Sequence, residues 1–178
     1  MDETPIYGLM AEFDDPEALV RAAQRSYVEG YRRMDAFTPF PVHGLAHALG
    51  LRRTEVPLIV LLGGLAGAAG GFLLQYWTAA VNYPINVGGR PYLSWPSFIP
   101  VTFEMLVLIA AFSAVFGMLA LNGLPMPYHP VFNVPSFQLA TRDRFFLLVM
   151  ATDPKFDRVE TRRFLQSLGA QDVAEVEP

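Results

Sequence analysis

The sequence contains no cysteine. A chain without cysteine forms no disulfide, supplies no thiolate ligand to an iron–sulfur cluster, and lacks the Cys-x-x-Cys-His attachment of a c-type haem. Because these are common ways for a protein to hold a redox centre, we expect no cofactor in this chain.

Basic residues are also scarce: the sequence has 13 Lys and Arg and 17 Asp and Glu, which gives a formal net charge of −4 at pH 7. Proteins that bind nucleic acid present a basic patch that replaces the counterions of the phosphates. The sequence has no basic stripe of this kind, so nucleic acid is not an expected partner.

Charge is almost absent from two long apolar runs, residues 56–81 and 99–124, where the single charged residue is Glu104. An α-helix needs about 20 apolar residues to cross a bilayer core about 30 Å thick. Both runs are longer than this. The sequence therefore predicts a hairpin of two transmembrane helices.

The loop between these runs, residues 82–98, has only Arg90 among the 13 Lys and Arg. Arg52 and Arg53 precede the first run, and Arg142 and Arg144 follow the second. Cytoplasmic flanks of membrane helices are enriched in Lys and Arg. We therefore predict that the loop is periplasmic and that both termini are cytoplasmic.

The segment before the first run has the pattern of strand, helix and strand. Residues 6–13 form an apolar run typical of a strand, and Asp14 or Asp15 can cap a helix that starts at Pro16. Apolar residues at three- and four-residue steps extend this helix to about Gly30, and residues 34–38 resemble a second strand.

The same order returns after the second run. Residues 144–152 are strand-like, Asp153 and Pro154 offer a cap and a first helical position, and residues 171–176 suit a last strand. The predicted helical stripe consists of Phe156, Val159, Phe164 and Leu165, and Leu168-Gly169 ends the helix.

Each half is too small to bury a core alone, so we predict that the halves pair as one cytoplasmic α+β domain of ferredoxin-like arrangement, with the membrane hairpin inserted between them. The expected segments are a first βαβ half (1–42), a juxtamembrane linker helix (43–55), transmembrane helix 1 (56–81), a periplasmic loop (82–98), transmembrane helix 2 (99–124), a proline-rich return (125–141) and a second βαβ half (142–178).

Two of these segments connect the hairpin to the domain. Residues 43–51 are predicted to form a short helix at the membrane surface, with Leu45, Leu49 and Leu51 on its apolar side. The return contains too many prolines for a long regular element and is expected to be extended over the protein surface.

Small residues repeat along the first run, with Gly63, Gly67 and Gly71 spaced by four. Such a seam lets another helix approach closely. The partner is either the second run or a helix of another subunit, and the sequence leaves both open. The small residues available on the second run are Ala110, Ser113, Ala114 and Gly117.

Glu104 is the ionisable residue that we place inside the hydrocarbon. Burying a charged side chain there costs about 2.5–3.5 kcal/mol on insertion scales, so Glu104 needs a partner, a cavity or water. It is either a residue of a proton path or a buried polar contact with a neighbouring polypeptide.

The remaining candidate chemistry is sparse. His43 and His47 are four residues apart and could supply two ligands on one helix face, but no third ligand is near them. His129 in the return is expected to be structural. We find no nucleophile with a base, no phosphate-binding loop and no catalytic acid pair, and we predict no catalytic metal and no activity of this chain alone.

Four segments resemble the D subunit of bacterial alternative complex III, a quinol:cytochrome c (or other acceptor) oxidoreductase. They are YGLMAEFDDPEAL, FTPFPVHGLAHALGLRR, PYHPVFNVPSF and RDRFFLLVMATDPKFD, and the resemblance covers nearly the whole chain. It implies a two-pass protein of the bacterial inner membrane with a cytoplasmic domain and no cofactor of its own.

The resemblance further implies a structural or assembly role in respiratory or photosynthetic electron transport. Haem c and iron–sulfur clusters would belong to partner subunits, and quinol would be oxidised at polytopic membrane subunits against which the hairpin packs. Two alternatives stay open: a membrane-tethered regulatory module that binds a small ligand, and an accessory proton-path subunit that uses Glu104.

Overall fold

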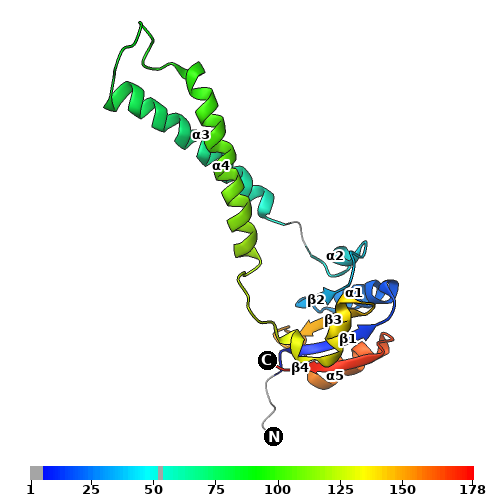
Figure 1. Ribbon diagram of the computed structural model, residues 1–178. Coiled ribbons are helices and arrows are strands. Elements are labelled where there is room, and N and C mark those ends of the chain that lie inside the picture. The colour runs from blue at the N-terminus through cyan, green and yellow to red at the C-terminus, as the bar shows by residue number, and fades with distance from the viewer. Residues whose placement is uncertain (1–5, 52–53) are drawn as a thin grey trace. The chain divides into compact units, whose positions relative to one another are not determined.

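The computed structural model describes residues 6–51 and 54–178, and the chain divides into two compact units (Figure 1). The sheet unit consists of Met1–Arg52 and Pro127–Pro178, and the hairpin unit of Arg53–Met126. Along the sequence, the hairpin unit thus separates two halves of the sheet unit. Arg52 and Arg53, used above to orient the hairpin, lie outside the described residues.

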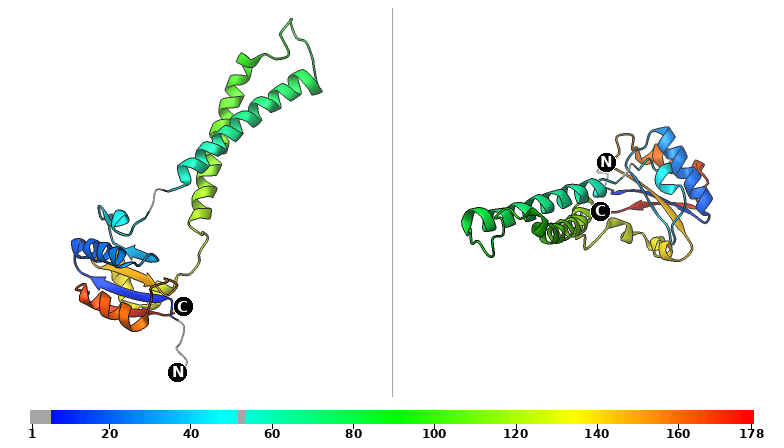
Figure 2. Two further views of the ribbon diagram at one scale, coloured as in Figure 1. Left: turned by 180° about the vertical axis from the view of Figure 1, so that it is seen from behind. Right: turned by 90° about the horizontal axis from the view of Figure 1, so that it is seen from above.

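The sheet unit contains one four-stranded antiparallel sheet of order β2-β3-β1-β4 (Figures 1 and 2). Its strands are β1 (Gly8–Phe13), β2 (Met34–Phe37), β3 (Phe145–Met150) and β4 (Asp172–Val176). The central pair, β1 and β3, comes from opposite ends of the sequence. Both halves are therefore needed to form the sheet.

One face of the sheet packs against α1 (Pro16–Glu29) and α5 (Arg158–Ser167). Alternate residues of the central strands point to this face, as the two-residue period of a strand requires. The fully buried members of this core include Leu9, Leu147, Leu19 and Leu165.

The other face is covered by two 3-10 helices of the proline-rich return, η2 (Pro130–Asn133) and η3 (Pro135–Thr141). The prediction of an extended return is wrong here. Proline cannot sit inside a long helix, but it is favoured at a first helical position, which Pro130 and Pro135 occupy. The residues buried against this face are Val131, Val134, Phe137 and Ala140.

The start of α1 is confirmed. Asp15 caps the helix by accepting a hydrogen bond from the Ala18 backbone N–H at 2.8 Å, and Pro16 is the first helical residue. Gly30 ends the helix with φ of 116°, a left-handed conformation that favours glycine.

The predicted start of the second helix at Asp153 and Pro154 is wrong, because α5 begins at Arg158. Asp157 is the cap and accepts hydrogen bonds from the backbone N–H groups of Val159 and Glu160. With the later start, Val159 is 55% exposed instead of belonging to the apolar stripe. Gly169, with φ of 85°, follows the helix as predicted.

The linker helix is shorter than predicted, since α2 spans only Leu45–Ala48. Leu45 and Leu49 are buried in the core of the sheet unit, where α2 packs against α1, whereas Leu51 is 60% exposed. Two of the three leucines assigned to a membrane surface thus stabilise the sheet unit.

The hairpin unit consists of α3 (Val56–Tyr76), which continues as a π-helix, η1 (Trp77–Asn82), and α4 (Trp95–Leu121). By length and composition, Val56–Asn82 and Trp95–Leu121 are able to cross a membrane. Helix α4 starts before the predicted Ile99 because Trp95-Pro96 places a proline in its first turn.

Candidate functional site

The glycines of α3 lie against α4. A Cβ atom on Gly71 would lie 2.8 Å from the Met105 Cβ atom, and one on Gly67 would lie 2.9 Å from the Ile109 Cβ atom and closer still to the Met105 carbonyl oxygen. No real Cβ atom tolerates such distances. The two helices therefore approach each other where only glycine fits.

Three of the four small residues predicted on α4 lie in this contact. Ala110 lies against Gly64, Ser113 lies against Gly63, and Gly117 lies against Ile59. Ala114 is half-buried. Gly70, by contrast, has open space around its Cα. Of the two partners that the sequence left open for the glycine seam, α4 occupies it within this chain.

Gln75 of α3 adds a polar link between the helices. Its side-chain amide donates hydrogen bonds to the Phe98 carbonyl oxygen at 3.0 Å and to the Thr102 hydroxyl at 3.3 Å, as well as to the Gly71 carbonyl oxygen at 3.1 Å. Sequence reasoning missed this contact. The available signal was an amide side chain within an otherwise apolar helix.

Glu104 is exposed on the surface of α4. Thr102, two residues before Glu104, and Met105, the next residue, both contact α3. The turn of an α-helix therefore places Glu104 on the side of α4 that faces away from α3. Within residues 6–51 and 54–178, no hydrogen bond or ion pair involves its carboxyl group. The hairpin thus presents one carboxyl group outward from an apolar helix.

In the described part of the chain, the histidines do not belong to a metal-binding cluster. His43 and His47 are exposed, and no group of three His, Cys, Asp or Glu side chains able to hold a metal occurs among the described residues. The His129 ring lies at the start of η2, where its Nδ1 atom accepts a hydrogen bond from the Val131 backbone N–H at 3.4 Å.

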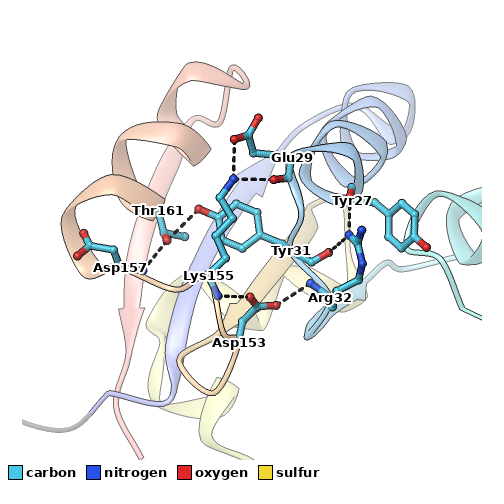
Figure 3. Close-up of polar contacts among 8 residues, drawn as sticks. All are labelled: Tyr27, Glu29, Tyr31, Arg32, Asp153, Lys155, Asp157 and Thr161. Atoms are coloured by element: carbon cyan, nitrogen blue, oxygen red, sulfur yellow. Dashed lines mark hydrogen bonds and ion pairs between the residues drawn. The ribbon is translucent and has the colours of Figure 1, made fainter.

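In the sheet unit, Asp153 is only 5% exposed and accepts three backbone hydrogen bonds, of which Figure 3 shows those from Arg32 and Lys155. The donors are the N–H groups of Arg32 at 2.6 Å, Arg33 at 2.7 Å and Lys155 at 2.9 Å. Burial raises the pKa of Asp153, but these hydrogen bonds and the Arg33 charge outweigh burial and hold the pKa below its ordinary value.

Further contacts join the same two halves of the sheet unit. The Lys155 ammonium donates to the Glu29 carboxylate at 2.6 Å, and the Tyr31 hydroxyl lies 3.0 Å from the Thr161 hydroxyl in the buried interior (Figure 3). Because the oxygens of Asp153 already accept protein hydrogen bonds, this cluster is a structural link between the halves.

A second acidic group, Glu175 on β4, accepts hydrogen bonds from both Arg158 and Arg162 of α5. The hydrogen bond from Arg158 is the main reason that the pKa of Glu175 is lowered; burial opposes this effect, and the charges of both arginines add to it. These two contacts connect α5 to β4, which is an edge strand of the sheet.

A groove of about 640 Å³ runs between α1 and α5. Its lining includes the exposed side chains of Arg21, Arg25 and Glu29. Arg21 already pairs with Asp15 and Glu17 at 3.8 and 3.4 Å. This groove is one of several in the sheet unit relevant to a small-ligand function.

Comparison with known proteins finds a family model described as "Alternative complex III, ActD subunit", which matches residues 7–175. No curated protein matches the chain. The matched residues include three strands, all but the last residue of β4, and both long apolar helices, and they confirm the resemblance seen in the sequence. The chain therefore belongs to the ActD subunit family of alternative complex III.

Proposed function

We propose that this chain is a non-catalytic structural subunit whose hairpin spans the bacterial inner membrane and packs against the polytopic subunits of alternative complex III. The observation that carries the proposal is which side chains lie between the two helices of the hairpin and which lie on its outside. Gly63, Gly67 and Gly71 of α3 pack against α4, whereas large apolar side chains cover the outside of the hairpin.

The outward side chains support a membrane environment. Leu61, Leu65, Phe103 and Phe116 are each 57–63% exposed on helices that carry almost no charge. Contiguous apolar surface of this extent marks contact with a membrane or a partner protein. In the proposed topology, the loop between the helices is periplasmic and both termini are cytoplasmic, in accord with the distribution of Lys and Arg.

The sheet unit is proposed to be a ferredoxin-like domain that covers the cytoplasmic side of the membrane subunits. Its antiparallel strand order and the two helices on one face support this assignment. The fold name carries no chemistry, because function depends on the site.

The redox centres are proposed to lie in partner subunits, as haem c and iron–sulfur clusters. The support is chemical, since a chain without cysteine has neither the Cys-x-x-Cys-His attachment of a c-type haem nor the thiolates that ligate an iron–sulfur cluster. Electron transfer would then proceed through the partners, and this chain would supply packing surface and a lipid-facing helix pair.

Purification of an affinity-tagged form of the chain from its native membrane tests the proposal. We expect co-purification of polytopic membrane subunits together with haem c absorbance and cluster signals. A cofactor-free homo-oligomer recovered without those subunits would contradict it, and binding of a metabolite in the α1–α5 groove would favour the regulatory alternative.

A further inference from the structure

The side of α4 that faces away from α3 carries Glu104. Successive residues of an α-helix are rotated by about 100°, so Glu104 is about 200° from Thr102, which bonds to Gln75 of α3. Its neighbours one and two turns further along are Leu108 and Ala111, and both are exposed. We call the surface formed by Glu104, Leu108 and Ala111 the Glu104 face.

The position along α4 puts this carboxyl group well inside the span. Glu104 follows Trp95 by nine residues, which at 1.5 Å per residue is about 13 Å. Trp95 and Trp77, both more than half exposed, mark the end of the hairpin where an interfacial aromatic belt is expected. Glu104 lies beyond that belt, towards the middle of the helix.

Several polar side chains near this end of the hairpin have partners within it. Gln75 bonds to Phe98 and Thr102, and Thr78 donates to the Leu74 carbonyl oxygen at 2.9 Å. Arg90, the basic residue of the connecting loop, donates to Ser97. Glu104 differs from them because, in the described part of the chain, nothing satisfies it.

We propose that the Glu104 face docks on a transmembrane helix of another subunit that presents an Arg, Lys or His side chain at the depth of Glu104. Ionisable side chains inside a membrane pair with one another or face the interior of a bundle, so the outward carboxyl group indicates a cationic partner. Leu108 and the small Ala111 supply the adjoining apolar contact. This inference rests on the proposed function and assigns its interface.

Photo-crosslinking in the intact complex tests the proposal. A benzophenone amino acid in place of Ala111 reports which molecule covers the Glu104 face, and mass spectrometry identifies the residue captured. In parallel, the variants Glu104→Gln and Glu104→Leu are compared with Phe103→Leu, an apolar control at a neighbouring exposed position. The measured quantity is the fraction of the chain retained in the purified complex after a stringent detergent wash.

The expected result is an adduct with a membrane helix of another subunit that bears Arg, Lys or His within one turn of the captured residue. Retention should fall at least threefold in both Glu104 variants and stay unchanged in Phe103→Leu. Adducts with lipid alone or with a second copy of the chain would overturn the inference, as would full retention of Glu104→Leu.

The experiments distinguish a failure of the proposed function from a failure of the proposed interface. If the unmodified chain does not co-purify with the redox subunits, the function is wrong; if it does and the Glu104 face captures only lipid, the function stands and the interface is wrong. The crosslinking is performed with Glu104 in place, so it decides the question even where a Glu104 variant does not fold.

Discussion

The Asp153 carboxylate accepts a hydrogen bond from the backbone N–H of Arg32 at 2.6 Å, across 121 residues of sequence that include the entire hairpin unit. This contact ties the loop after β3 to the residues before β2. It is one reason that the sheet unit forms from two distant pieces of chain.

Replacing Asp153 should destabilise the sheet unit strongly. Asp153→Ala removes the acceptor of three part-buried backbone hydrogen bonds, which costs about 3 kcal/mol when each donor loses part of its hydrogen bonding. Hydrogen exchange of β3 amides in the full-length chain should accelerate by about 100-fold. The control Asp143→Ala changes an exposed carboxylate and should leave exchange as in the unmodified chain; equal rates for both variants would contradict the assigned role.

Acid should weaken the same unit. The pKa values of Asp153 and Glu175 are lowered in the folded state, so both groups contribute stability that is complete above the ordinary carboxyl pKa. That stability is lost as the pH falls through the folded values, which places the decline below about pH 4. A pH series of unfolding free energies should be shallower for Asp153→Asn combined with Glu175→Gln, and an unchanged slope would refute this origin.

The glycine seam should be sensitive to a single methyl group. Gly67→Ala puts a Cβ atom against the backbone of α4 and must push the helices apart, whereas Gly70→Ala enters open space. Because the chain has no cysteine, spin labels at two introduced cysteines can report the separation of α3 and α4. The separation should increase in Gly67→Ala alone; an equal response of both variants would mean that the seam is not the contact.

The Gln75 amide should contribute modestly. Gln75→Leu removes the hydrogen bonds to the Phe98 carbonyl oxygen and to Thr102, and interhelical hydrogen bonds in membranes contribute about 0.6 kcal/mol each on average. Unfolding of the hairpin in detergent micelles should therefore show a loss of about 1 kcal/mol in unfolding free energy for the two bonds. Thr78→Ala, whose hydroxyl bonds only within its own helix, serves as the control and should have a smaller effect.

Local signals predicted much of the sheet unit. The sequence around Asp15 and Pro16 contains the full start signal of a helix, and the structure confirms it. At Asp153 and Pro154 the same signal was misleading, because a carboxylate that caps one helix can instead bind distant backbone N–H groups. The correct start was visible as Asp157 and Glu160, a cap residue followed three positions later by an acid.

The sequence did not decide which side of α3 meets α4. Small residues occur on both sides of the helix, since Gly67 and Gly70 are both glycines of the same run. Which of them is buried depends on how two helices pack, and spacing alone does not contain that information. The Gln75 link was missed for the same reason, as its acceptors belong to the other helix.

The central claim is that this chain holds the complex together and takes no part in its chemistry. The most direct measurement is quinol oxidation per haem in complexes purified from cells with and without the chain, alongside the yield of assembled complex. We predict that yield falls sharply without the chain and that turnover per haem of the remaining assembled complex is unchanged. Normal assembly with lost turnover would contradict the claim.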